Sequence, residues 1–174
     1  DLVRSRGLGD VYKRQVLSLL VANHFGVLTR VTNLFGQRGF NIDSLAVGET
    51  ENPRFSRITI TTHGDERVIN QIKLQLAKLE DVKAVVEIPE EQLFIREVVL
   101  IKAEPKKAQM EAFEQAVADF GGRLQIVEGD VYVIELTDTP DSINYFIEEL
   151  QDFHIREISR TGGVALELSR ETVY

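Results

Sequence analysis

Hydrophobic and polar positions follow one pattern along most of the chain, and the pattern occurs twice. In the first half, short runs that are apolar throughout or that alternate with polar residues predict four strands, at residues 16–21, 40–47, 55–61 and 82–88. Apolar residues recur at helical spacing over 28–35 and over 69–79, and Gly64-Asp65 is a cap for the second stripe. The predicted order is strand, helix, strand, strand, helix, strand.

The second half repeats this order with a different sequence. Strands are predicted at residues 98–103, 124–127, 131–134 and 153–158. Two helices are predicted, with apolar stripes formed by Met110, Phe113, Val117 and Phe120, and by Ile143, Phe146, Ile147 and Leu150. Corresponding elements lie about 75–80 residues apart. We therefore predict an α+β fold made of two tandem ferredoxin-like βαββαβ domains.

Charge changes along the chain and marks the boundary between the predicted domains. The net charge is +2 over residues 1–15, zero over 16–87 and −10 over 88–174, which gives −8 in total. We expect a first domain at residues 16–88 and a linker at 89–96. A second domain at 97–168 and a tail at 169–174 follow.

The first fifteen residues fit none of this. Their apolar residues follow neither the helix period nor the strand period. We expect residues 1–15 to be a disordered extension or an artefact of the sequence, and an arm that binds a partner is the alternative.

The composition excludes several classes of function. The chain has 174 residues and no cysteine, so disulfides, thiolate nucleophiles and Cys-ligated metals are impossible. Three histidines lie far apart, and no motif for a metal site or a catalytic triad occurs. No apolar run is long enough to cross a membrane, and the acidic second half repels nucleic acid. We expect a soluble, cytoplasmic protein with no nucleic-acid or membrane partner.

One segment has the chemistry of a ligand site. The loop Asn23-His24-Phe25-Gly26 leads from a predicted buried strand into a helix, where free backbone N–H groups favour a carboxylate. Asn23 and Asn41 offer amide groups for a ligand ammonium or carboxylate, and Val27, Leu28 and Ile42 are candidates for an apolar wall. Together these groups describe a site for an aliphatic α-amino acid.

Two plainer interpretations remain open for these residues. Asn23 and Gly26 are also typical of a helix cap and a turn, and Asn41 of a turn. The run Gly36-Gln37-Arg38-Gly39 matches the GXXG loop that clamps RNA in KH domains, but it is predicted to join a helix to a strand, so we interpret it as helix termination.

The same residues carry a resemblance to a known family. The runs Asn23 to Val31 and Leu34 to Leu45, above all Arg38-Gly39-Phe40-Asn41-Ile42-Asp43-Ser44-Leu45, resemble the ACT domain of the small, regulatory subunit of acetolactate (acetohydroxyacid) synthase. Glu157 and Arg160-Thr161-Gly162 resemble its final segment. Phe25 departs from the family, which often has proline there.

The resemblance implies a regulatory subunit without an active site of its own. Its partner would be the catalytic large subunit, which holds thiamine diphosphate, Mg²⁺ and FAD, and this chain would hold no cofactor. The small subunit activates that enzyme and confers feedback inhibition by a branched-chain amino acid, usually valine. The family pattern also implies a homodimer through the ACT domains, with the effector between Asn23 to Leu28 of one copy and Asn41 and Ile42 of the other.

Two further hypotheses belong to different classes. A free-standing, amino-acid-sensing ACT regulator would act on another protein partner, and the lack of a helix-turn-helix or basic patch argues against direct DNA binding. A small enzyme on the same plait would need an activated nucleophile or an acid–base pair, and none was found.

Overall fold

A computed structural model describes residues 14–172 and divides them into two compact units. The first unit comprises the chain up to Phe94 and the chain from Ala165 onward. The second unit is Ile95–Val164. Most of the expected extension, residues 1–13, lies outside the described residues, as do residues 173–174. Within 14–172, no helix combines the length and apolarity that a bilayer crossing needs.

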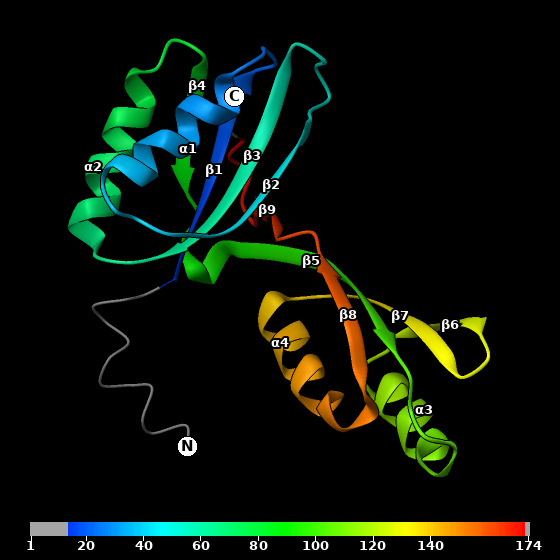
Figure 1. Cartoon of the computed structure of the whole chain (residues 1–174). Helices are drawn as coiled ribbons and strands as arrows, with labels where there is room; N and C mark the ends of the chain where they lie inside the picture. Colours follow the sequence, from blue (N-terminus) through cyan, green and yellow to red (C-terminus); the bar gives the residue numbers. More distant parts are fainter. Residues whose placement is uncertain (1–13, 173–174) are drawn as a thin grey trace. The chain divides into compact units, whose positions relative to one another are not determined.

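The first unit has the predicted βαββαβ order. Its four-stranded antiparallel sheet has the strand order β2-β3-β1-β4, and α1 and α2 cover one face (Figure 1). The strands are β1 (Arg14–Ala22), β2 (Ile42–Glu49), β3 (Phe55–His63) and β4 (Val82–Glu87), and the helices are α1 (Val27–Gln37) and α2 (Glu66–Lys78). β2 and β4 are therefore the edge strands.

The core of the first unit lies between the sheet and its two helices. Alternate residues of β1 and β3 point toward the helices, and the stripes of α1 and α2 pack on them, as the pattern predicts. Fully buried members of this core are Leu17, Leu19, Val31, Phe35, Ile58, Ile60, Ile69, Ile72 and Leu76. Burial of each such side chain contributes about 1.5–3 kcal/mol, which makes this sheet–helix layer the rigid base of the domain.

The second unit repeats the plait. Its sheet order is β6-β7-β5-β8, and β9 also pairs with β5. The strands of this order are β5 (Leu93–Ala103), β6 (Arg123–Glu128), β7 (Val131–Asp138) and β8 (Ile155–Arg160). β9 (Val164–Glu167) begins at the last residue of the second unit and continues into the first. The helices are α3 (Met110–Asp119) and α4 (Pro140–Glu149), and short 3₁₀ turns are η1 (Glu90–Gln92), η2 (Lys107–Gln109) and η3 (Gln151–Phe153).

The predicted stripes of α3 and α4 build the second core. Phe113, Val117, Ile143 and Phe146 are buried, and they pack in one cluster with Ile134 of β7. Aromatic rings pack against one another in this core. The ring centroid of Phe113 lies 5.5 Å from that of Phe153 and 5.7 Å from that of Tyr132. The two-domain, ferredoxin-like α+β fold expected from the pattern is confirmed.

The boundaries of the parts differ from the expected ones. β1 begins at Arg14, so Arg14 and Gln15, which we had assigned to the extension, pair with His63 and Thr62 of β3. β5 begins at Leu93, inside the expected linker, and the chain from Ala165 onward belongs to the first unit rather than the second.

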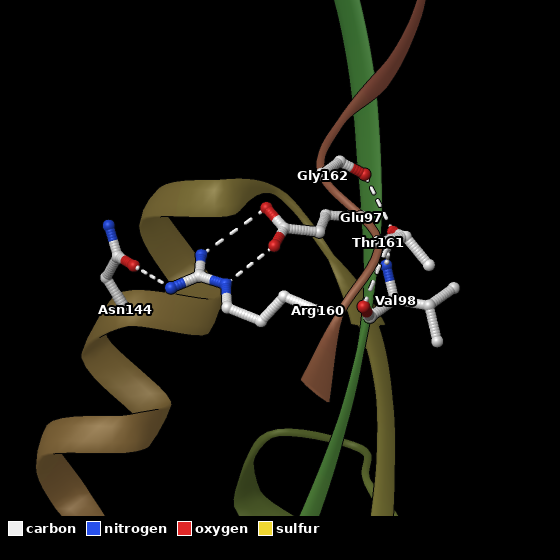
Figure 2. A network of polar contacts seen from close by, with 6 residues as sticks. All are labelled: Glu97, Val98, Asn144, Arg160, Thr161 and Gly162. Atoms are coloured by element: carbon white, nitrogen blue, oxygen red, sulfur yellow. Dashed lines mark hydrogen bonds and ion pairs between the residues drawn. The ribbon is translucent and has the colours of Figure 1, made fainter. Parts of the chain in front are cut away.

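A buried ion pair lies in β5 just before the predicted start of the strand. Glu97 of β5 is 4% exposed, and its carboxylate accepts hydrogen bonds from Nε and Nη2 of Arg160, at 2.6 and 3.3 Å. Arg160 also donates to Oδ1 of Asn144 on α4 at 2.7 Å (Figure 2). A charged residue at this position is compatible with a buried strand because its partner neutralises it.

The neighbouring Thr161 fixes the chain after β8. Its hydroxyl accepts a hydrogen bond from the Val98 N–H at 3.1 Å and donates to the Gly162 carbonyl at 2.7 Å (Figure 2). Gly162 has φ +79°, a value that suits glycine. The Arg160-Thr161-Gly162 run, which the sequence resemblance singled out, therefore holds the last strands of the second unit on β5.

Candidate functional site

The candidate loop is a tight, exposed connection between β1 and α1. The Asn23 N–H donates to the Arg54 carbonyl at 2.8 Å, and its side-chain amide donates to the Pro53 carbonyl at 3.2 Å. These two bonds anchor the loop to the turn before β3. Asn23 is therefore not the N-cap of α1, and the cap interpretation of this residue is wrong.

Gly26 is the N-cap of α1 and leaves the helix start open. Its φ is +85°, it offers no side chain for capping, and a Cβ placed there meets nothing within 4 Å. The first N–H groups of a helix need an acceptor from outside when no cap supplies one. By contrast, Asp65 caps α2 by accepting from the Arg67 N–H at 2.8 Å, and Thr139 caps α4 by accepting from the Ser142 N–H at 3.2 Å. The N–H groups at the start of α1 therefore have no side-chain acceptor.

The side chains around this helix start divide into two groups. Phe25 is fully exposed, and Asn23, His24 and Leu28 are also exposed. Val27 is only 3% exposed and packs in the core with Val31 and Phe35. Within one copy, Val27 therefore supports the loop from below and is not free to form the apolar wall that we expected of it.

Asn41 and Ile42 lie at the opposite end of the first sheet. Ala22, just before the loop, pairs with Phe55, whereas Ile42 pairs with Thr62. These two positions of β3 are seven residue steps apart, which corresponds to roughly 24 Å at ~3.4 Å per residue. A single copy therefore does not bring Asn41 and Ile42 to the loop at residues 23–28.

A shallow depression of about 530 Å³ lies beside the loop within the first unit. Asn23 and His24 form part of its lining, together with charged residues of both signs, Arg54, Glu80, Asp81 and Lys83. Asp81 also pairs with Arg30 of α1 at 3.0 Å. No local sequence signal marks these charged residues as neighbours of the loop. They lie near other elements in the sequence, and only the fold brings them to the loop.

Among residues 14–172, no group of three or more His, Asp or Glu side chains is placed to hold a metal ion. The chemistry of the described site is thus that of a helix terminus with amide and mixed-charge neighbours. These groups offer hydrogen-bond donors, acceptors and charges of both signs.

Comparisons with known proteins show that the first unit is an ACT domain, a class that agrees with its βαββαβ fold. Residues 17–84 match the model of the AHAS small subunit-like ACT domain, and residues 96–169 match that of the small subunit of acetolactate synthase. The acetolactate synthase isozyme 3 small subunit of Salmonella typhimurium is 40% identical over 154 residues, which are 88% of this chain and 94% of that protein. A probable small subunit from Methanothermobacter thermautotrophicus is 38% identical, over 91% of this chain and 95% of that protein.

A solved structure gives the same result for both units. The crystal structure of the acetolactate synthase small subunit from Thermotoga maritima matches with a TM-score of 0.81 and 39% identity, over 89% of this chain and 97% of that one. The chain belongs to the family of acetolactate synthase small subunits. The resemblance inferred from the sequence is thereby confirmed.

Proposed function

We propose that this chain is a regulatory subunit that activates the catalytic subunit of acetolactate synthase and confers feedback inhibition by valine or another branched-chain amino acid. The observation that carries the proposal is the open helix start at Gly26, on an ACT domain of this family. Its role is to bind, and the thiamine diphosphate, Mg²⁺ and FAD that the reaction uses are assigned to the catalytic partner. The pathway served is branched-chain amino acid biosynthesis.

Two copies are needed to complete the proposed effector site. β2 is an edge strand, so its outer hydrogen-bonding groups are available to a second copy. Antiparallel pairing of two β2 strands places Ile42 of one copy near Glu49 of the other. Glu49 pairs with Ser56 of β3, two residues after Arg54. The carbonyl of Arg54 accepts the hydrogen bond from Asn23 that anchors the loop. Such a homodimer therefore brings Asn41 and Ile42 of one copy to the loop of the other.

Each part of the proposed site recognises one part of the effector. The effector carboxylate accepts hydrogen bonds from backbone N–H groups at the start of α1. The Asn41 side chain of the second copy accepts from the ammonium group. Leu28, which is 42% exposed, and Ile42 contact the aliphatic side chain. His24 and Phe25 lie at the rim, where the absence of proline leaves the loop less constrained.

The first experiment is a thermal-shift screen of the purified chain against the twenty amino acids. A ligand at 100 times its dissociation constant stabilises the folded state by about 2.7 kcal/mol. A shift confined to valine, leucine or isoleucine supports the effector assignment. Reconstitution with a catalytic large subunit then tests activation and inhibition, and capture of a different partner from cell extract would favour the free-standing regulator instead.

A further inference from the structure

The end of β3 supports the second half of the proposed effector site from behind. The hydroxyl of Thr62 donates a 2.6 Å hydrogen bond to the backbone carbonyl of Asn41. Thr62 is fully buried, so this bond is shielded from water on the Thr62 side. The bond fixes the peptide that carries the Asn41 side chain.

The next residue of β3 holds the next part of the same segment. The register of β2 with β3 shifts between Ile42 and Ser44, which leaves Asp43 as an extra residue. The imidazole of His63 pairs with the carboxylate of Asp43. A bulge of this kind re-aims the side chains beside it, and His63 restrains the bulge.

A third constraint comes from Gly64, which follows β3. The ring of Phe40 lies directly on Gly64, and a Cβ there would overlap the ring. The side-chain amide of Gln15 donates to the Gly64 carbonyl at 3.2 Å, which ties this backbone to β1. Phe40 is thereby fixed next to Asn41.

The adjacent threonine on β3 provides a natural comparison. The Thr61 hydroxyl is buried and has no hydrogen-bond partner among the described residues, and its side chain lies on the other face of the sheet from Thr62. Thr61 is thus a buried threonine of the same strand that makes no bond to Asn41, which suits it as a control for Thr62.

We propose that the corner formed by Thr62, His63 and Gly64 is a positioning element that sets effector affinity through Asn41. The inference rests on the proposed function and extends it to residues that are not expected to contact the effector. An amide that must meet an ammonium group needs a fixed backbone, because mobility of its peptide lowers affinity through the entropy of ordering. Loss of the Thr62 bond should weaken feedback and leave the uninhibited reaction unchanged.

The test uses the holoenzyme reconstituted with a catalytic large subunit, and valine is the probe. Thr62→Val keeps the shape and removes the hydroxyl, Thr62→Ser restores a hydroxyl, and Thr61→Val is the matched control. We expect the valine concentration for half-inhibition to rise about 3- to 10-fold in Thr62→Val, the effect of one hydrogen bond. Thr62→Ser and Thr61→Val should stay close to the unsubstituted chain, and the rate without valine should be equal in all four.

The outcomes separate this inference from the proposed function. Unchanged inhibition of Thr62→Val, an equal loss in Thr61→Val or a failure of Thr62→Ser to restore sensitivity would each overturn the positioning role. If the unsubstituted holoenzyme responds to no branched-chain amino acid, the proposed function fails, and the inference fails with it. If Thr62→Val does not fold, His63→Gln is the second variant, because the His63 side chain is half-exposed and its replacement is tolerated more easily. It should raise the valine concentration for half-inhibition about 2- to 3-fold.

Discussion

The two units share a fold but treat the connection from their first strand to their first helix differently. In the first unit, four residues join β1 to α1, and Gly26 leaves the helix start without a side-chain cap. In the second unit, six residues join β5 to α3, and a 3₁₀ turn, η2, fills the space before the helix. Pro105 is buried in this connection, whereas Phe25 is fully exposed in the other.

Side-chain hydrogen bonds complete the contrast. Oε1 of Gln109 accepts from the Lys106 N–H at 3.0 Å, and Nε2 of Gln109 donates to the Asp152 carbonyl at 3.0 Å. Neither α1 nor α3 has a side-chain cap, but the second connection is closed by the bonds of Gln109 and by a 3₁₀ turn, whereas no 3₁₀ turn precedes α1. Under the proposed function, the open connection of the first unit receives the effector, and the second unit is a scaffold.

The largest expected effect comes from blocking the open connection. Gly26→Asp introduces a negative charge where the effector carboxylate should lie, on a residue with φ +85° that disfavours a side chain. We expect valine to lose at least about 100-fold in inhibitory potency. Titration of the reconstituted holoenzyme with valine measures this.

The matched control places the same substitution in the second unit. Gly129 also has a positive φ, +59°, and open space around its Cβ position. Gly129→Asp should leave inhibition unchanged. Equal inhibition of Gly26→Asp and the unsubstituted chain would contradict the assignment of the receptor connection.

The next effect concerns the group expected to meet the ligand ammonium. Asn41→Ala should weaken effector binding by about 1–3 kcal/mol, because a buried polar group of the ligand is left without its partner. Isothermal titration calorimetry with valine gives the difference. Asn144→Ala is the control, since Asn144 bonds to Arg160 in the second unit, and a wild-type affinity for Asn41→Ala would refute the prediction.

A smaller effect is expected from opening the closed connection. Gln109→Ala removes the two side-chain hydrogen bonds that Gln109 makes at η2, and the second unit should lose about 0.5–1.5 kcal/mol of stability. Urea unfolding at fixed protein concentration reports the loss. Valine inhibition should not change, and a parallel loss of inhibition would show that the second connection is not merely a scaffold.

The smallest effect is expected at the exposed aromatic ring. Phe25→Ala should change the unfolding free energy of the free chain by less than about 0.5 kcal/mol, because the ring buries no area in one copy. Urea unfolding at low protein concentration checks this value. A loss above 1 kcal/mol would mean that the loop packs its ring against the protein even without a ligand.

Local patterns predicted the elements and their caps. The stripes around Phe35, Leu76, Phe113 and Phe146 are buried as expected, because apolar periodicity reports directly which face packs. The Asp65 cap followed from the residue types alone. These features depend on residues close in sequence, so local sequence patterns are enough to predict them.

Long-range partners were not predictable in the same way. β5 includes the buried Glu97, which pairs with Arg160, 63 residues later, and no local signal marks that pair. The bond from Thr62 to Asn41 joins residues 21 positions apart across two strands. The sequence analysis named Asn41 from its side-chain chemistry, but it missed Thr62, since a threonine in a strand is an ordinary residue.

The return of the chain to the first unit makes the second unit an inserted cassette. The chain leaves the first unit after Phe94 and re-enters it at Ala165, and the Leu168 N–H donates to the Gln92 carbonyl at 2.7 Å, so the two crossing points are neighbours. Chain ends that lie this close can be joined by a short linker, or can accept a foreign domain, with little strain on the host fold. The first unit is thereby open to modular exchange, in which residues 95–164 are replaced without a change to the connection at Gly26.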